Sequence, residues 1–374
     1  GRLSFFVNAG IRFVTEMCKM RAFVDLWDEI LIERYGVEDP KFRRFRYGVQ
    51  VNSLGLTEQQ PENNVYRILV EMLAVTLSKK ARARAVQLPA WNEALGLPRP
   101  WDQQWSMRMQ QIMAFETDLL EYEDLFEGNQ VVEAKVDSLK ASARYELETI
   151  ETQGGALNAI DYMKSRLVES NTDRLQNIES NVTTVVGVNK FTKTEKSPLV
   201  SGDGGIMTVD PAVEKDQIDR LNQWRTNRNE KLVNKALLSL RQAALHGKNI
   251  MLPSIEAAKA GATTGEWAQE MRNIYGEYRG PTGVATGISN KTDGLDELRS
   301  AVDAVSDKLG ERLKFLMGKP GLDGHSNGAE QIASRARDCG MKIEYQGIRL
   351  TPVSYTHLRA HETRGNLVCR LLLE

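Results

Sequence analysis

Short extended runs alternate with helix-forming segments over the first hundred residues. Residues 3–7, 45–51 and 83–88 each predict a strand. Apolar side chains recur at three-to-four spacing after the first two, from Val14 to Ile30 and from Val65 to Val75, which indicates amphipathic helices. Residues 101–115 predict a third helix. This rhythm is typical of βα units with parallel strands.

The middle of the chain is mostly helical in pattern. Helices are expected over 141–152 and 156–169, and a fourth strand over 183–188. Pro198 and three glycines between 194 and 209 indicate a linker. Two more predicted helical stretches, 216–245 and 255–278, read as a connector that ends in a second glycine-rich joint at 280–292.

A new strand and helix are predicted near the end. Residues 313–318 predict a strand, 321–328 a glycine-rich loop, 329–339 a helix, and 341–345 a second strand. This is a βαβ unit of the doubly wound type, in which ligands bind at the carboxyl ends of the strands.

Charge and cysteine usage exclude several classes of function. Lys and Arg total 49 against 50 for Asp and Glu, so no long-range field favours nucleic acid. Three dispersed cysteines indicate neither a disulfide framework nor a structural zinc site, and a reducing cytoplasm is expected. No apolar run reaches the roughly 20 residues that cross a bilayer.

His325 is the one of four histidines in an informative setting. It lies in the loop between a predicted strand and helix, two residues after Asp323, which can accept the second ring N–H and fix the tautomer. Gly328 would let a bulky ligand approach the backbone. The alternative is a polar loop that caps the next helix. His246 is expected to cap a helix end, and Cys18 and Cys339 to be buried thiols.

The pattern Asp323-x-His325-x-x-Gly328 after a strand resembles the cobalamin-binding motif of base-off mutases. The wider string at 318–329 is similar to the adenosylcobalamin-dependent acyl-CoA mutases, the methylmalonyl-CoA mutase family. The resemblance implies adenosylcobalamin as cofactor, His325 as the cobalt ligand and Asp323 as its hydrogen-bond partner. The other cofactor contacts that it implies are Gly324, Ser326, Asn327, Gly328 and Ile332.

The first hundred residues carry the same resemblance independently. Arg2-Leu3-Ser4-Phe5-Phe6 is similar to the family's R-L-S-F-F strand, which implies that Arg2 and Ser4 contact the acyl-CoA. Residues 56–67 resemble the L-T-x-Q-x-x-x-N-N segment, and 92–98 the D-E-A-x-x-L-P segment. The second implies that Glu93 holds the adenosyl group, with Gly96 and Leu97 beside the corrin.

One departure from the methylmalonyl pattern R-x-H-x-Q-T-S-G-W lies at residues 46–54. Gln50 is kept, as a catalytic and substrate-binding residue by resemblance, whereas the histidine position is Gly48. Residues 49–105 most resemble the ethylmalonyl-CoA mutase subfamily, which implies radical isomerisation of ethylmalonyl-CoA to methylsuccinyl-CoA. Methylmalonyl-CoA or isobutyryl-CoA remain alternative substrates. A non-catalytic cobalamin-binding subunit, and an unrelated barrel enzyme with an accidental motif, remain alternative classes.

The resemblance implies an α/β architecture of three parts. We expect the C-terminal part of a (β/α)8 barrel at 1–196, a linker and helical connector at 197–306, and the start of a flavodoxin-like cobalamin domain at 307–352. Residues 353–374 no longer resemble the family and are expected to be a non-native tail, so a metal face at His357 and His361 is discounted. A chain that opens at Gly1 is interpreted as a fragment, inactive alone, of a cytoplasmic homodimer.

Overall fold

The computed structural model describes residues 3–81, 83–200, 202, 204–208, 210–276, 295–318 and 327–345, without the side chains at 327, 328, 330, 331 and 334. The chain divides into two compact units, Gly1–Thr208 and Val209–Glu374. Each unit is described by itself.

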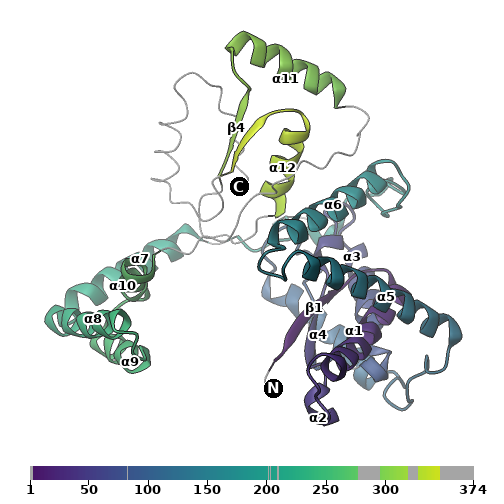
Figure 1. The fold of residues 1–374 in the computed structure, drawn as a ribbon, viewed down its shortest axis with the longest axis horizontal. Coiled ribbons are helices and arrows are strands. Elements are labelled where there is room, and N and C mark those ends of the chain that lie inside the picture. The colour runs from purple at the N-terminus through teal and green to yellow at the C-terminus, as the bar shows by residue number, and fades with distance from the viewer. Residues whose placement is uncertain are drawn as a thin grey trace. The chain divides into compact units, whose positions relative to one another are not determined.

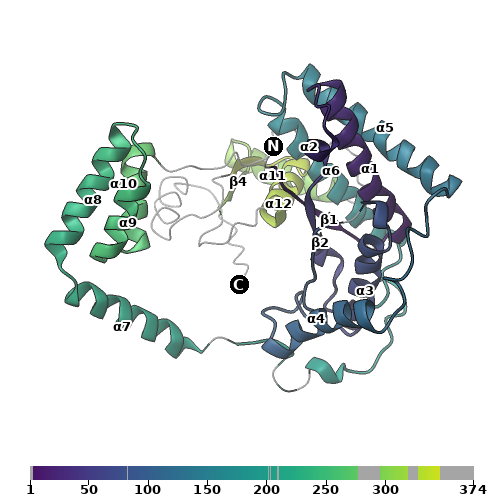
Figure 2. The same cartoon turned by 90° about the horizontal axis from the view of Figure 1, so that it is seen from below.

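A parallel three-stranded sheet lies at the centre of the first unit (Figures 1 and 2). Its strands, in spatial order, are β1 (Phe5–Ala9), β2 (Tyr47–Val51) and β3 (Ala85–Gln87). The connections contain the long helices α1 (Phe13–Glu33) and α3 (Asn63–Thr76), the short helix α2 (Pro40–Arg43), and the 3-10 turns η1 (Ser53–Gly55) and η2 (Lys79–Ala81). The predicted βα rhythm is confirmed, with strand bounds shifted by up to two residues.

One face of this sheet is buried against helices. Ala9, Tyr47, Val49 and Val51 are each at most 1% exposed, and they pack with side chains of α1 and α3. Because neighbouring side chains in a strand point to opposite faces, the residues between them lie on the other face of the sheet. This second face is the more exposed one.

Three further helices complete the first unit: α4 (Pro100–Phe115), α5 (Gln130–Thr152) and α6 (Ile160–Glu179), followed by the 3-10 turn η3 (Pro198–Val200). Helix α5 packs along α1 (Figure 1). Cys18 of α1 is buried there against Val132 and Val136. Nearby, the guanidinium of Arg21 donates to Asp124 at 2.7 Å and to the Ser78 hydroxyl at 2.8 Å. A buried charge is tolerated there because its hydrogen-bonding capacity is met.

The predicted strand at 183–188 is wrong. The segment forms turns, in which Gly187 has a φ of +84° and Val186 makes a single bridge to Lys190. The side chain of Asn189 replaces a strand partner: it accepts from the Val185 N–H and donates to the Thr183 carbonyl, both at 2.8 Å. A β-branched run therefore did not form a strand, because a local side chain satisfied its backbone instead.

The second unit begins with α7 (Pro211–Asn227), α8 (Glu230–Leu245), α9 (Met251–Ala260) and α10 (Thr264–Tyr275). Helix α8 packs against both α9 and α10 (Figure 2). The two predicted helical stretches are each interrupted: Asn229 caps α8 after the first break, and Gly261, with a φ of +96°, ends α9. His246 ends α8 as predicted. No helix in the described part of the chain is long and apolar enough to span a membrane.

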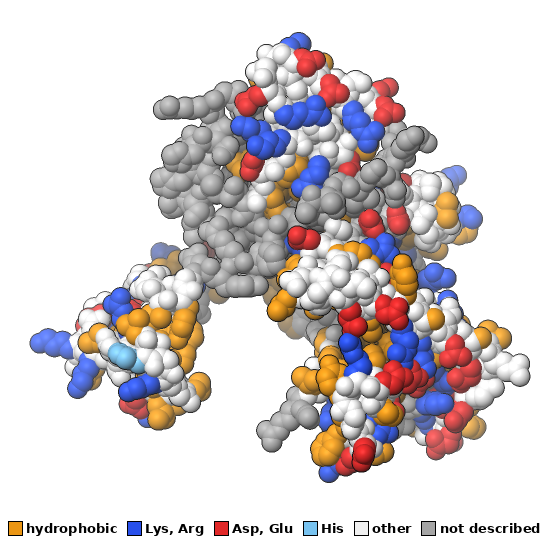
Figure 3. All heavy atoms as spheres, viewed as in Figure 1, with side chains coloured by type: hydrophobic (Ala, Val, Ile, Leu, Met, Phe, Trp, Pro, Cys, Tyr) orange, Lys and Arg blue, Asp and Glu red, His pale blue; other side chains and the backbone are white. Residues whose placement is uncertain are grey.

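The last described segments form the predicted βαβ unit. Helix α11 (Asp296–Leu309) comes first. Strands β4 (Lys314–Met317) and β5 (Lys342–Tyr345) then pair in parallel, and α12 (Asn327–Asp338) lies between them in the sequence. Ala329 and Ala333 are buried on α12, and Cys339 is buried just beyond it, as predicted. Figure 3 shows basic and acidic side chains intermingled over the visible face of the described residues.

Candidate active site at the carboxyl edge of the sheet

Three side-chain amides stand in one row across the sheet. Asn8 of β1 is in register with Gln50 of β2, and Gln50 is in register with Gln87 of β3. All three residues are exposed and lie on the open face, near the carboxyl ends of their strands. Each amide offers both donors and an acceptor. In parallel barrels this edge is where substrates bind.

An apolar row lies directly beneath the amides. Phe6 is in register with Gly48, and Gly48 with Ala85. The Phe6 ring covers Gly48, which is buried although it lies on the open face, while the Phe6 residue itself stays 59% exposed. The open face therefore combines an aromatic surface with hydrogen-bonding groups.

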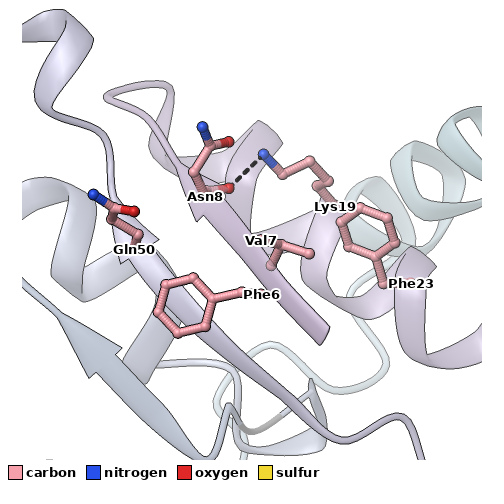
Figure 4. Close-up of a pocket in the computed structure, with 6 residues that line it drawn as sticks. All are labelled: Phe6, Val7, Asn8, Lys19, Phe23 and Gln50. Atoms are coloured by element: carbon pink, nitrogen blue, oxygen red, sulfur yellow. Dashed lines mark hydrogen bonds between the residues drawn. The ribbon is translucent and has the colours of Figure 1, made fainter. Parts of the chain in front are cut away.

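A hollow of about 450 Å³ surrounds this part of β1 (Figure 4). Its lining consists of Phe6, Val7, Asn8, Lys19, Phe23 and Gln50. The close-up shows Phe6 and Gln50 on one side of β1 and Lys19 on the other, where its ammonium donates to the Asn8 carbonyl at 2.9 Å. The Lys19 contact satisfies a strand-edge carbonyl, and the same ammonium forms an ion pair with the Glu16 carboxylate at 2.5 Å.

The loop after β3 is held rigidly by the buried carboxylate of Asp102. That carboxylate accepts from the Trp91 indole at 2.9 Å, from the Asn92 amide at 2.8 Å, and from the Arg99 backbone and guanidinium. Burial alone would raise the pKa of Asp102, but the hydrogen bonds from Arg99 and Trp91 hold it below the usual value. The same Asn92 amide donates to the Gly205 carbonyl at 2.6 Å.

Three predicted cofactor residues project from this loop. Glu93 and Leu97 are exposed, although the neighbouring Trp91 and Asn92 are fully buried. Gly96 adopts a φ of +149°, and a Cβ there would lie 3.3 Å from Ile206, so glycine suits this position. The Leu97 carbonyl accepts from Met207 at 2.8 Å. The loop therefore presents an exposed carboxylate and an exposed apolar side chain from a backbone held by hydrogen bonds.

The segment that resembles L-T-x-Q-x-x-x-N-N has a structural role. Asn64 is fully buried, and its amide donates to the carbonyls of Thr57 and Trp91, both at 2.9 Å. It thereby joins the loop after β2 to the loop after β3. Arg67 donates to Asn64 and Thr57 and strengthens the same junction.

The structure describes the positions of only some of the other predicted residues. Ser4 is exposed just before β1. Arg2, the sequence from Asp323 through Ser326, and both tail histidines lie outside the described residues. Asn327 and Gly328 begin α12, and Ile332 is half-buried on it. The structure places Gln50 next to β1, the strand that Ser4 precedes. The assignment of His325 as the cobalt ligand stays a prediction.

Sequence reasoning missed Asn8, Gln87 and a buried carboxylate on α3. Glu71 is 1% exposed, and its Oε2 has no hydrogen-bond partner among the described atoms. Burial, together with the nearby charge of Glu16, raises the pKa of Glu71 to about 8. No local pattern linked the two amides to Gln50, because their alignment depends on the register between separate strands, and Glu71 gave no signal either.

Comparison with known sequences places the chain in a family. The sequence profile described as methylmalonyl-CoA mutase matches residues 1–277, about three quarters of the chain. The chain therefore belongs to the methylmalonyl-CoA mutase family, whose fold is of the (β/α)8-barrel type, in agreement with the parallel sheet and the many helices observed.

Two relatives carry a more particular name. The chain is 70% identical over 362 residues to the ethylmalonyl-CoA mutase of Cereibacter sphaeroides, which covers 97% of the chain and 56% of that relative. It is 62% identical over 354 residues to the ethylmalonyl-CoA mutase of Methylorubrum extorquens, covering 94% and 51%. The methylmalonyl-CoA mutase of Escherichia coli is 30% identical over 368 residues, covering 96% and 50%. The chain spans about half the length of these relatives.

Proposed function

We propose that the protein to which this chain belongs isomerises ethylmalonyl-CoA to methylsuccinyl-CoA with adenosylcobalamin. One observation carries the proposal: a row of exposed amides at the carboxyl edge of a parallel sheet, in a chain 70% identical to a relative named ethylmalonyl-CoA mutase. The sheet edge supports an acyl-binding role because it offers oriented polar groups beside an apolar surface.

The acyl group would lie across the open face of the sheet. Gln50 and Asn8 would hydrogen-bond its carbonyl or carboxylate oxygens, and the Phe6 ring would contact its carbon skeleton. Ser4, exposed at the start of β1, would contact the CoA portion together with Arg2. Such contacts fix the reacting carbons in place, which is the protein's main contribution to a rearrangement of this kind.

The residues of the loop after β3 fit the adenosyl end of the cofactor. The exposed carboxylate of Glu93 can accept hydrogen bonds from ribose hydroxyls, and Gly96 and Leu97 offer a flat, partly apolar contact for a corrin. The Asp102 network keeps that loop in place. Adenosylcobalamin, when bound, supplies the radical chemistry of the carbon-skeleton rearrangement.

By resemblance, the βαβ unit of β4, α12 and β5 would belong to the domain that binds cobalamin. Ligands of doubly wound domains bind at the carboxyl ends of the strands, and Asn327 begins α12 soon after β4 ends at Met317. We assign His325 as the cobalt ligand and Asp323 as the group that orients its imidazole. Asn327, Gly328 and Ile332 would line the same site, in a cobalamin domain. The homodimer and the cytoplasmic location expected above stay predictions.

The test is an assay of the full-length protein with adenosylcobalamin. Ethylmalonyl-CoA should be converted to methylsuccinyl-CoA, detected by mass spectrometry, faster than methylmalonyl-CoA or isobutyryl-CoA is isomerised. His325→Ala should abolish the absorbance change that accompanies cofactor binding. Cofactor binding without turnover of any acyl-CoA would favour the non-catalytic binding subunit instead, and a preference for methylmalonyl-CoA would favour the activity named for the Escherichia coli relative.

A further inference from the structure

Gly48 is the one position of the apolar row that lacks a side chain, and its neighbour Phe6 uses the space. A Cβ built on Gly48 would lie 2.6 Å from Cε2 and 2.9 Å from Cδ2 of the Phe6 ring. Gly48 is not among the glycines with positive φ, so its backbone is open to any residue. The constraint on residue 48 therefore comes from the aromatic ring above it and not from the backbone.

A side chain at position 48 would force the ring away from β2. Carbon atoms in contact lie about 3.5–4.0 Å apart, so the nearest ring carbon would have to move by about 1 Å. The backbones on both sides are fixed by the pairing of Phe6 with Gly48 and of Gly48 with Ala85. The ring is therefore the part that must move, and because Phe6 is 59% exposed on the open face, we expect it to move outward from that face.

That outward direction is the space assigned to the acyl group. Phe6 lines the hollow together with Asn8 and Gln50 (Figure 4). A displacement of about 1 Å approaches the length of a carbon–carbon bond, about 1.5 Å. A larger residue at position 48 would therefore displace the Phe6 ring and reduce the space for the acyl group by about the length of one carbon–carbon bond.

We propose that Gly48 and Phe6 together determine which acyl branch the site accepts. Gly48 allows the ring to lie against β2 and leaves room for an ethyl branch; a side chain at position 48 raises the ring and favours a methyl branch. The inference rests on the proposed function and deepens it.

The test compares Gly48→Ala with wild type in the full-length protein loaded with adenosylcobalamin. We expect the ratio of kcat/KM for ethylmalonyl-CoA to that for methylmalonyl-CoA to fall by about 10-fold or more, the usual discrimination for one methylene group. A second change, Phe6→Leu in the Gly48→Ala background, removes the ring edge and should restore most of the ratio. Gly55→Ala is the matched control, because its Cβ would meet only Glu71 Oε1, at an ordinary 3.7 Å.

An equal loss of activity toward both substrates, with no recovery in the double variant, would overturn the inference. Calorimetric Kd values for the two acyl-CoAs separate this failure from that of the proposed function. If the wild type turns over neither substrate, the proposed function is wrong. A change in the ratio of the two Kd values in Gly48→Ala would still support a role for Gly48 and Phe6 in selecting the acyl branch. An unchanged ratio would refute that role. Should Gly48→Ala not fold, Phe6→Leu alone should raise relative activity or affinity for a propyl branch, and no rise refutes the pair.

Discussion

The two faces of the β1–β3 sheet are made from alternate residues of the same strands, yet they differ in how far their side chains are buried. Toward the helices, Tyr47 and Val49 are almost fully buried. On the open face, Phe6, Asn8 and Gln50 are exposed, and two of them carry side-chain amides. Residues that stabilise the fold and residues that are available to bind a substrate therefore alternate along the same strands.

The difference in burial between the two faces predicts which property of the protein a substitution will change. A residue on the helix side should change the free energy of unfolding, whereas a residue on the open face should change activity with little effect on unfolding. We expect this separation of effects to hold in the full-length protein.

The largest effect is expected for Tyr47→Ala. The change removes a buried aromatic ring that packs against Phe45 and Ala81, and it should cost about 4 kcal/mol of unfolding free energy. Urea unfolding monitored by circular dichroism measures the loss. Gln50→Ala, three residues along β2 on the opposite face, is the control and should change stability by less than about 0.5 kcal/mol. Similar losses for the two variants would refute the separation of the faces.

The second effect concerns Glu71, which lies on the helix side. Its folded pKa of about 8 exceeds the value of an unfolded glutamate, so the folded state binds the extra proton and stability declines as the pH rises through this interval. Between pH 5.5 and 8 the loss should approach about 3 kcal/mol, at about 1.4 kcal/mol per pH unit. Glu71→Gln should remove this slope in thermal unfolding. A slope unchanged by the substitution would assign the pH dependence to other groups.

The third effect is on activity. Gln50→Ala removes one oriented amide from the proposed acyl site and should lower kcat/KM for ethylmalonyl-CoA by about 100-fold, which is typical of a lost hydrogen-bond donor that stabilises a transition state. Gln103→Ala on the exposed surface of α4 is the matched control and should retain activity. If Gln50→Ala keeps full activity, the amide row does not hold the acyl group.

The smallest effect is expected for Asp102→Asn in the loop after β3. The neutral amide cannot serve all the donors of Arg99, Trp91 and Asn92, which should cost about 2 kcal/mol. Because Trp91 lies 6.0 Å from Trp105, ring centre to ring centre, tryptophan fluorescence should report the loosened loop. Asp118→Asn, at an exposed site, should leave both stability and fluorescence unchanged.

Local periodicity explains what the sequence determined by itself. The βα rhythm, helices α1, α3 and α4, and the final βαβ unit all follow from spacing that neighbouring residues dictate. The breaks in the helical connector also follow from local residues, Asn229 and Gly261, although the prediction did not use these signals. Family resemblance pointed to Gln50 and Glu93, both of which the fold leaves exposed.

Only the tertiary structure decided which distant residues meet. The register of three separate strands places Asn8, Gln50 and Gln87 in one row, and the same register sets Phe6 over Gly48. Burial of Glu71 beside Glu16 requires two helices to pack together. The failed strand at 183–188 has the same origin, because a strand forms only where a partner is available for its backbone, and pairing between distant segments is not encoded in local spacing.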